Sequence, residues 1–182
     1  IDRKGDTYVN MSNTVVASTN AVCAIVASAS RLGDCNGEPT DLAEYFGTSD
    51  ISLEPGDLVV AAGQAIGGLL SDGLETSKAW IAKASTSYSK ALMGIVSTQP
   101  NQVYGERVFS PEENARPVAL AGRVPVKVNL NGGSIKTGDF LTSSKVPGIA
   151  MKANQPGMVI GQALESLDTI GSGSFAKVVT FV

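Results

Sequence analysis

The sequence predicts an all-β protein, an antiparallel β-sandwich or β-clip-like barrel with an internal pseudo-duplication and an extended N-terminal arm. Three observations predict this class. Short apolar segments recur at intervals of about 8–12 residues, a spacing typical of sandwiches and barrels. Twenty glycines and eight prolines lie among these segments and supply their turns. A Gly-Asp turn followed by an apolar segment occurs twice, which indicates a repeated unit.

The clearest predicted strand is 124–130, in which Val124, Val126, Val128 and Leu130 alternate with other residues. Such alternation is typical of a strand with one buried face. Asn131-Gly132-Gly133 follows and tolerates the positive φ of a tight turn. The other strands predicted from residue 51 onward are 58–60, 92–96, 118–120, 140–142, 158–160 and 177–182.

One segment, Thr76–Lys90, permits a helix. Trp80, Ala84 and Tyr88 recur at helical spacing within this stretch, which is rich in Ala, Ser and Lys. Two strands are the alternative, because Trp80-Ile81 and residues 85–89 are compatible with β structure.

Two pairs of segments indicate the duplication. LEPGDLV at 53–59 is similar to IKTGDFL at 135–141, and MGIVS at 93–97 is similar to IGQAL at 160–164. In each Gly-Asp turn we expect Gly to adopt a special backbone angle and Asp to accept hydrogen bonds from neighbouring amides. The later Gly lies inside a predicted strand, where it indicates a bulge or a close backbone approach.

Residues 1–38 differ from the rest, so we divide the chain into an N-terminal arm or hairpin at 1–38 and a β-rich domain at 39–182. Residues 22–27 are apolar on both faces of a strand, although near-helical spacing from Val15 to Ala29 leaves a helix open. Such an arm must pack on its own domain or complete a neighbour's sheet. The residues we assign to intersubunit assembly are Tyr8, Val9, Met11, Val15, Val16, Val22, Ile25 and Val26.

Two cysteines, Cys23 and Cys35, suit a hairpin closed by a disulfide, since turn residues surround Cys35. Two free buried thiols are the alternative. A disulfide would place the protein outside the cytoplasm. Asn10-Met11-Ser12 is a glycosylation sequon and agrees with that location.

The composition excludes several classes of function. The chain has no histidine, so Ser-His-Asp and Cys-His catalysis and imidazole zinc sites are impossible. A net charge of −3 argues against nucleic-acid binding. The longest apolar run, Ala21–Ala27, is far shorter than the roughly 20 residues that span a bilayer. The glycine-rich segment Gly63–Gly68 lacks the Lys and Ser/Thr of a phosphate loop, and we expect no cofactor.

Carboxylates are densest between residues 34 and 57. They could perform acid–base catalysis, bind a hard cation such as Ca²⁺, or lie in solvated turns. No Asp-x-Asp-x-Asp-Gly loop is present, so we expect no metal site and favour solvated turns. The residues concerned are Asp34, Glu38, Asp41, Glu44, Asp50, Glu54 and Asp57.

An ordered series of motifs begins at residue 41: DLAEYF at 41–46, EPGDLVV at 54–60, GIVSTQP at 94–100, PVALAGRVPVKV at 117–128, GDFLTSS at 138–144, PGIAMKA at 147–153 and IGQALE at 160–165. This series resembles the C-terminal β-domain of phage tail fibres and appendages and of large bacterial surface proteins. It is similar to the peptidase G2 group, the autocleaving intramolecular chaperone domain. The resemblance covers about residues 39–182.

The resemblance implies cleavage before an aspartate with a second acid close by. The matching stretch here is Thr40-Asp41 with Glu44, so Asp41 and Glu44 are the candidate autocleavage residues. Because residues 1–40 remain joined to the domain in this chain, we favour a structural module with no catalytic residue.

Together these patterns predict a secreted structural protein. We expect a self-assembling subunit of an extracellular filament, tube or appendage, located at the cell surface or on a virion, with strand exchange through the arm. Its partners would be copies of itself, as a homopolymer or trimer. The alternative is an autoproteolytic intramolecular chaperone domain of a phage tail fibre or appendage. A carbohydrate-binding sandwich is disfavoured, since aromatic residues make up only 5% of the chain.

Overall fold

The computed structural model describes residues 23–24, 32–33, 41–63, 66–69, 75–105 and 108–182, and the side chains of 41–63, 78–105 and 108–182. The chain separates into two compact units, Ile1–Pro39 and Thr40–Val182. In the first unit, β1 (Cys23–Ala24) pairs antiparallel with β2 (Leu32–Gly33). The arm residues assigned to assembly, Thr40 and Cys35 lie outside the described residues, as does the Cys23 side chain.

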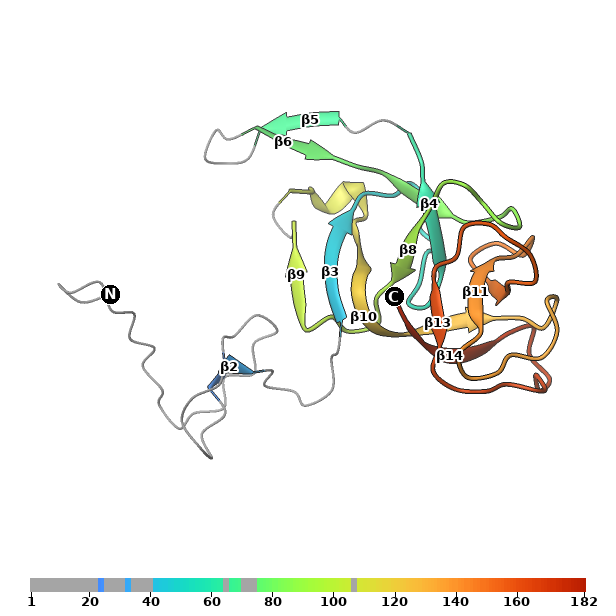
Figure 1. Cartoon of the computed structure of the whole chain (residues 1–182). Helices are drawn as coiled ribbons and strands as arrows, with labels where there is room; N and C mark the ends of the chain where they lie inside the picture. Colours follow the sequence, from blue (N-terminus) through green and yellow to red (C-terminus); the bar gives the residue numbers. More distant parts are fainter. Residues whose placement is uncertain (1–22, 25–31, 34–40, 64–65, 70–74, 106–107) are drawn as a thin grey trace. The chain divides into compact units, whose positions relative to one another are not determined.

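The regular secondary structure of the second unit consists almost entirely of strands (Figure 1), which confirms the predicted all-β class. Its one short 3₁₀ helix among the described residues is Pro111–Glu113. The strands are β3 (Asp41–Phe46), β4 (Leu58–Ala61), β5 (Ile66–Leu69), β6 (Glu75–Lys78), β7 (Ile81–Lys83), β8 (Leu92–Val96), β9 (Gln102–Tyr104), β10 (Arg116–Val128), β11 (Phe140–Ser143), β12 (Ala150–Lys152), β13 (Gly161–Ala163) and β14 (Ala176–Phe181).

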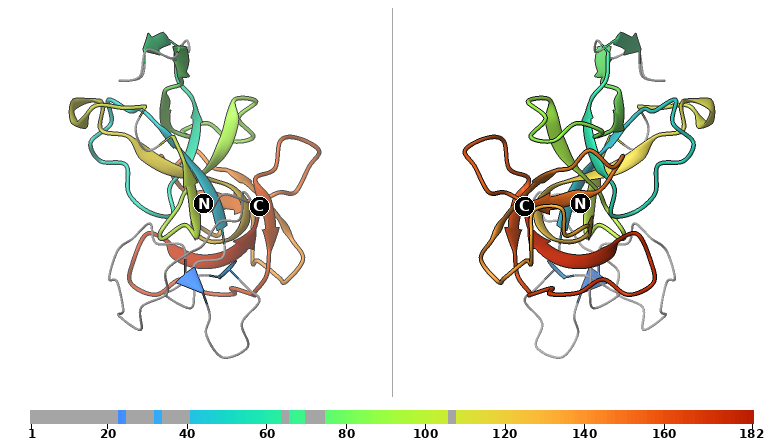
Figure 2. Two further views of the ribbon diagram at one scale, coloured as in Figure 1. Left: turned by 90° about the vertical axis from the view of Figure 1, so that its left-hand side faces the viewer. Right: turned by 90° about the vertical axis from the view of Figure 1, so that its right-hand side faces the viewer.

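The C-terminal half of β10 and the strands β11 to β14 form a closed barrel, which we call barrel B. Its hydrogen-bonded order is β12, β11, β13, β14 and β10, and a parallel pairing of Val128 with Ala150 joins the last strand to the first. Figures 1 and 2 show the orange-to-red strands gathered around the C-terminal half of β10. Closure removes the unpaired edges that an open sheet would expose.

A second barrel, barrel A, has the same connectivity and uses the N-terminal half of β10. Here β7, β4, β8, β10 and β3 pair in that order, and a parallel bridge between Gly47 and Trp80 joins β3 to β7. The strands of the two barrels therefore correspond in pairs: β3 to the C-terminal half of β10, β4 to β11, β7 to β12, β8 to β13, and the N-terminal half of β10 to β14. β9 pairs in parallel with β3 outside this barrel. The hairpin β5–β6 lies in the connection between β4 and β7.

The two barrels repeat the same turn in detail. Gly56 and Gly138 have φ of 93° and 91°. The amide of Glu54 donates to the Asp57 carboxylate (3.1 Å), and the amide of Lys136 donates to the Asp139 carboxylate (2.7 Å). The amide of Gly56 donates to the carbonyl of Val96 in β8 (2.9 Å), and the amide of Gly138 donates likewise to the carbonyl of Ala163 in β13 (2.8 Å). The predicted duplication is therefore confirmed, along with the geometry expected for its Gly-Asp turns.

The barrel interiors correspond position by position. Barrel A encloses Phe46, Leu53, Val59, Ile81, Val96 and Val118. The equivalent positions in barrel B are Val126, Ile135, Leu141, Ala150, Ala163 and Thr180, all of them buried. The alternating apolar residues of 124–128 therefore face the interior of barrel B, as their period-2 pattern predicts.

Of the two alternatives for Thr76–Lys90, strands are observed and not a helix: β6 ends at Lys78 and β7 spans Ile81–Lys83, although residues 85–89 form no strand. The predicted strand at 158–160 was wrong, since the observed β13 begins only at Gly161. The predicted strands 118–120 and 124–130 are confirmed up to Val128, but they are parts of one strand, β10, which continues through Gly122 and serves both barrels.

Candidate functional site

Asp41 is the first described residue of the second unit and opens β3. β10 holds it on one side, where Asp41 pairs with Gly122. On the other side the amide of Asn101 donates a hydrogen bond to the carbonyl oxygen of Asp41 (2.8 Å). The backbone immediately after the Thr40–Asp41 peptide bond is therefore fixed from both sides.

The Asp41 side chain is buried, with 6% of the residue exposed. Its Oδ2 atom and the nearby Oγ of Ser97, which is also buried, both lack a hydrogen-bond partner among the described residues. Burial raises the pKa of the Asp41 carboxyl because the charged form loses hydration, and the neighbouring Ser97 hydroxyl opposes this rise in part. No hydrogen bond of standard geometry joins the two side chains. The site thus holds a carboxyl whose neutral form is favoured.

Glu44, the second acid suggested by the resemblance, is also in β3 but three positions further on. Successive side chains of a strand point to opposite faces, so Glu44 and Asp41 lie on opposite faces of β3. Asp41 shares its face with buried Ala43, while the Glu44 side chain lies near Gly105. The fold of one chain therefore does not bring these two carboxylates together.

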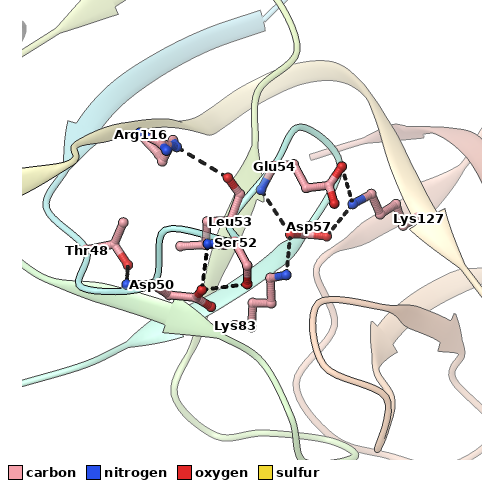
Figure 3. Close-up of polar contacts among 9 residues, drawn as sticks. All are labelled: Thr48, Asp50, Ser52, Leu53, Glu54, Asp57, Lys83, Arg116 and Lys127. Carbon is pink, nitrogen blue, oxygen red and sulfur yellow. Dashed lines mark hydrogen bonds and ion pairs between the residues drawn. The ribbon is translucent and has the colours of Figure 1, made fainter.

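The carboxylates of the 34–57 cluster separate into different environments. Asp34 and Glu38 lie outside the described residues. Asp50 accepts hydrogen bonds from the amide (2.9 Å) and hydroxyl (2.6 Å) of Ser52, and the hydroxyl contact lowers its pKa (Figure 3). No group of three or more acidic or Cys residues suited to a metal ion occurs in the described ranges.

Asp57 belongs to a buried ionic cluster that sequence reasoning missed (Figure 3). Its carboxylate contacts Lys127 Nζ of β10 at 2.7 Å and Lys83 Nζ of β7 at 3.3 Å, and Glu54 lies 3.4 Å from Lys127 Nζ. Asp57 is 1% exposed and Lys127 3% exposed. Lys127 Nζ also lies 5.2 Å from the ring centre of Phe175. Because Asp57 also holds the Gly-Asp turn, this cluster connects that turn to β10 and serves the architecture.

Barrel B has a matching ion pair. Lys152 of β12 contacts Asp139 at 2.7 Å, as Lys83 of β7 contacts Asp57. This contact lowers the pKa of the Asp139 carboxyl. The sequence signal that could have found these pairs is a lysine at the strand position facing each Gly-Asp turn.

The described part of the chain includes no helix with the length and apolar character needed to cross a membrane. No protein-family model and no curated protein matches the sequence.

Two crystal structures from a bacteriophage resemble this chain. The C-terminal fragment of bacteriophage phi29 gene product 12 superposes with a TM-score of 0.51 at 17% identity, over 78% of this chain and 99% of the fragment. The two chains share a fold. The pre-mature bacteriophage phi29 gene product 12 superposes with a TM-score of 0.52 at 14% identity, over 85% of this chain. This chain spans 23% of the length of that pre-mature protein.

Proposed function

We propose that this chain is a component of a phage tail appendage, with residues 40–182 forming its C-terminal domain. The shared fold with a C-terminal fragment of a bacteriophage protein supports this role. The ordered motifs from Asp41 to Glu165 support it independently. The location that follows is the virion, outside the cell.

Self-cleavage of the Thr40–Asp41 bond is the activity that we propose for this domain. The observation that carries it is the buried Asp41 carboxyl with its unpartnered Oδ2, placed directly after the boundary between the two units. In its protonated form, which burial favours, this carboxyl can donate a proton to the departing nitrogen of Asp41 while water adds to the Thr40 carbonyl carbon. The products would be residues 1–40 with a new carboxylate and residues 41–182 with a new amine.

Glu44 does not supply the base for this reaction from within the same strand, because it lies on the other face of β3. We therefore assign Asp41 as the acid and leave the activation of water to solvent or to a group from another copy. The proposal differs in this respect from the expectation that both acids act side by side.

Intact-mass measurement of the purified full chain tests this activity. We expect a break between Thr40 and Asp41, faster at low pH because the acid form of Asp41 is then populated, and no break in Asp41→Asn or Asp41→Ala. Asp139→Asn is the control, since Asp139 directly precedes strand β11 but is ion-paired to Lys152 and lies far along the chain from the Thr40–Asp41 bond. A wild-type chain that stays intact, or Asp41→Asn cleaving at the wild-type rate, would overturn the proposal.

A structural, self-assembling role of the uncleaved chain is the second candidate. The exposed apolar side chains of barrel B, such as Phe140 and Phe181, favour it. In this role residues 1–38 complete a neighbour's sheet, and a Cys23–Cys35 disulfide stabilises the arm. Mass measurement with and without reductant tests the disulfide, which predicts a gain of two hydrogens on reduction.

A further inference from the structure

The outward face of barrel A is buried within the chain. Leu58, Ile95 and Ala119 are neighbours across β4, β8 and β10, and each is at most 1% exposed. They belong to the same apolar cluster as the interior of barrel B. Barrel B therefore covers this face of barrel A.

The duplicated fold places the equivalent row on barrel B at Phe140, Gln162 and Phe181. These residues are paired across β11, β13 and β14 in the same register. Phe140 is 53% exposed and Phe181 is 55% exposed. A face that is covered in one barrel is thus uncovered in the other, where its row consists of two phenylalanines with Gln162 between them.

A hollow adjoins the uncovered row. It has a volume of about 500 Å³ and is lined by Phe140, Ala153, Val159 and the segment 154–157. Ala153 and Val159 correspond to Ala84 and Leu92 of barrel A, both of which are buried.

The loop between β11 and β12 covers the equivalent place on barrel A. The amide of Leu58 donates to the carbonyl of Gly148 (2.8 Å), and the amide of Gly148 donates to the carbonyl of Ala84 (2.8 Å). The backbone of barrel B thus adds directly to barrel A at these positions. The corresponding loop of barrel A is the one that carries β5 and β6.

We propose that the uncovered face of barrel B, formed by Phe140, Ala153, Val159, Gln162 and Phe181, binds barrel A of a second copy of this chain. Within the chain, a barrel of the same fold covers the equivalent residues of barrel A. The β11–β12 loop of barrel B is already engaged in that contact, which leaves barrel A of another copy as the partner of the same fold. None of the five residues is charged, which suits an apolar partner of the same fold. The contact is head to tail, so it either closes into a ring or continues as a filament.

This inference deepens the proposed assembly by naming its surface, and it does not depend on residues 1–38. Photo-cross-linking tests it directly. The full chain carries a benzophenone amino acid at position 140 or 181 and is mixed with isotope-labelled wild-type chain. We expect cross-links between copies that map to residues 41–120. Position 146 is the control, since Val146 is 41% exposed and lies in barrel B outside this face, and we expect no such cross-links from it.

Cross-links to residues 1–40, cross-links joining barrel B to barrel B, or none between copies would each overturn the proposal. Sedimentation of the full chain gives a second measurement. Phe140→Ser with Phe181→Ser should weaken association at least tenfold, and Val146→Ser should leave it unchanged. Equal association of both variants would contradict the proposal, provided that their melting curves match.

The outcomes separate this inference from the proposed function. An intact Thr40–Asp41 bond would overturn self-cleavage, and the cross-linking result would still test the contact between the barrels. Assembly lost only on removal of the arm, with no cross-links from positions 140 and 181, would support arm exchange and overturn the role of barrel B.

Discussion

At the scale of single residues, Asp41 carries an ionisable carboxyl in a buried position, where the charged form is disfavoured. Its raised pKa means that the folded chain holds this proton more tightly than the unfolded chain does. Stability contributed by Asp41 is therefore highest at low pH and declines as pH rises from about 4 through the pKa of the folded state. The native structure tolerates the free-energy cost of a buried carboxylate at this position, next to the boundary between the two units in the sequence.

Asp41→Asn should accordingly stabilise the chain at neutral pH. One proton is involved, so the gain over wild type can grow by no more than about 1.4 kcal/mol per pH unit, and it levels off above the folded pKa. Urea titrations between pH 4 and pH 8 measure it. Asp168→Asn should show no growing gain over this range, because Lys136 lowers the pKa of Asp168 and the pH dependence of its contribution lies below about pH 4. A pH-independent difference for Asp41→Asn would contradict the assignment.

Lys127 provides a second residue-scale prediction. Its ammonium is buried against Asp57, so Lys127→Met leaves the Asp57 carboxylate with only Lys83 as its ionic partner. We expect a loss of about 3–5 kcal/mol in unfolding free energy, the usual cost of breaking a buried pair. Lys136→Met, which removes the exposed pair with Asp168, should cost less than about 1 kcal/mol. Equal losses in calorimetry would show that burial of the Asp57 cluster has no energetic weight.

At the scale of elements, the equivalent strands β8 and β13 each contain a glycine, Gly94 and Gly161, at a position where a side chain would clash with the neighbouring strand. A Cβ atom on Gly94 would lie 2.3 Å from Val118 Cγ1, and one on Gly161 would lie 2.3 Å from the carbonyl oxygen of Phe181. These strand glycines let β8 and β13 approach their neighbours closely, as predicted from the sequence.

Gly94→Ala and Gly161→Ala should therefore each destabilise the chain by about 1–3 kcal/mol or more, because the strands must separate. Gly161→Ala should be the more damaging, since the atom nearest to its Cβ is a backbone oxygen, whereas at Gly94 it is a side-chain methyl of Val118. Gly171→Ala is the control, as nothing lies within 4 Å of its Cβ position. Thermal denaturation ranks the three variants, and a neutral Gly161→Ala would contradict this account.

Strand prediction succeeded where period-2 patterns and turn residues coincide. The segment 92–96 is β8, and the alternation of 124–128 belongs to β10. At Thr76–Lys90 the pattern left a helix and two strands open, and the parallel bridge of Trp80 to Gly47 requires extended chain there.

At the scale of the whole molecule, the arm remains the main prediction of the sequence. Deletion of residues 1–20 should abolish assembly by strand exchange, because the proposed exchanged strand comes from the arm. Electron microscopy and circular dichroism of the truncated and full-length chains measure polymers and folding. Polymers that persist unchanged after the deletion would contradict arm exchange.

The candidate site was only partly predictable. Asp41 and Glu44 were selected by their position in a motif, yet the alternation of side chains in β3 separates them. Ser97 was missed because an isolated serine after an apolar strand has no distinguishing signal. Its proximity to Asp41 depends on β10 pairing with both β3 and β8.

The sequence by itself determined the all-β class, the Gly-Asp turns and the duplication, because these depend on local alternation and on glycine and aspartate chemistry near in the chain. Only the tertiary structure decided that one long strand, β10, serves both barrels, that Lys127 and Lys83 meet Asp57, and that Phe140 and Phe181 remain exposed where Leu58 and Ala119 are covered. Those outcomes depend on contacts between residues far apart in the sequence, and local sequence patterns do not specify which surfaces come into contact.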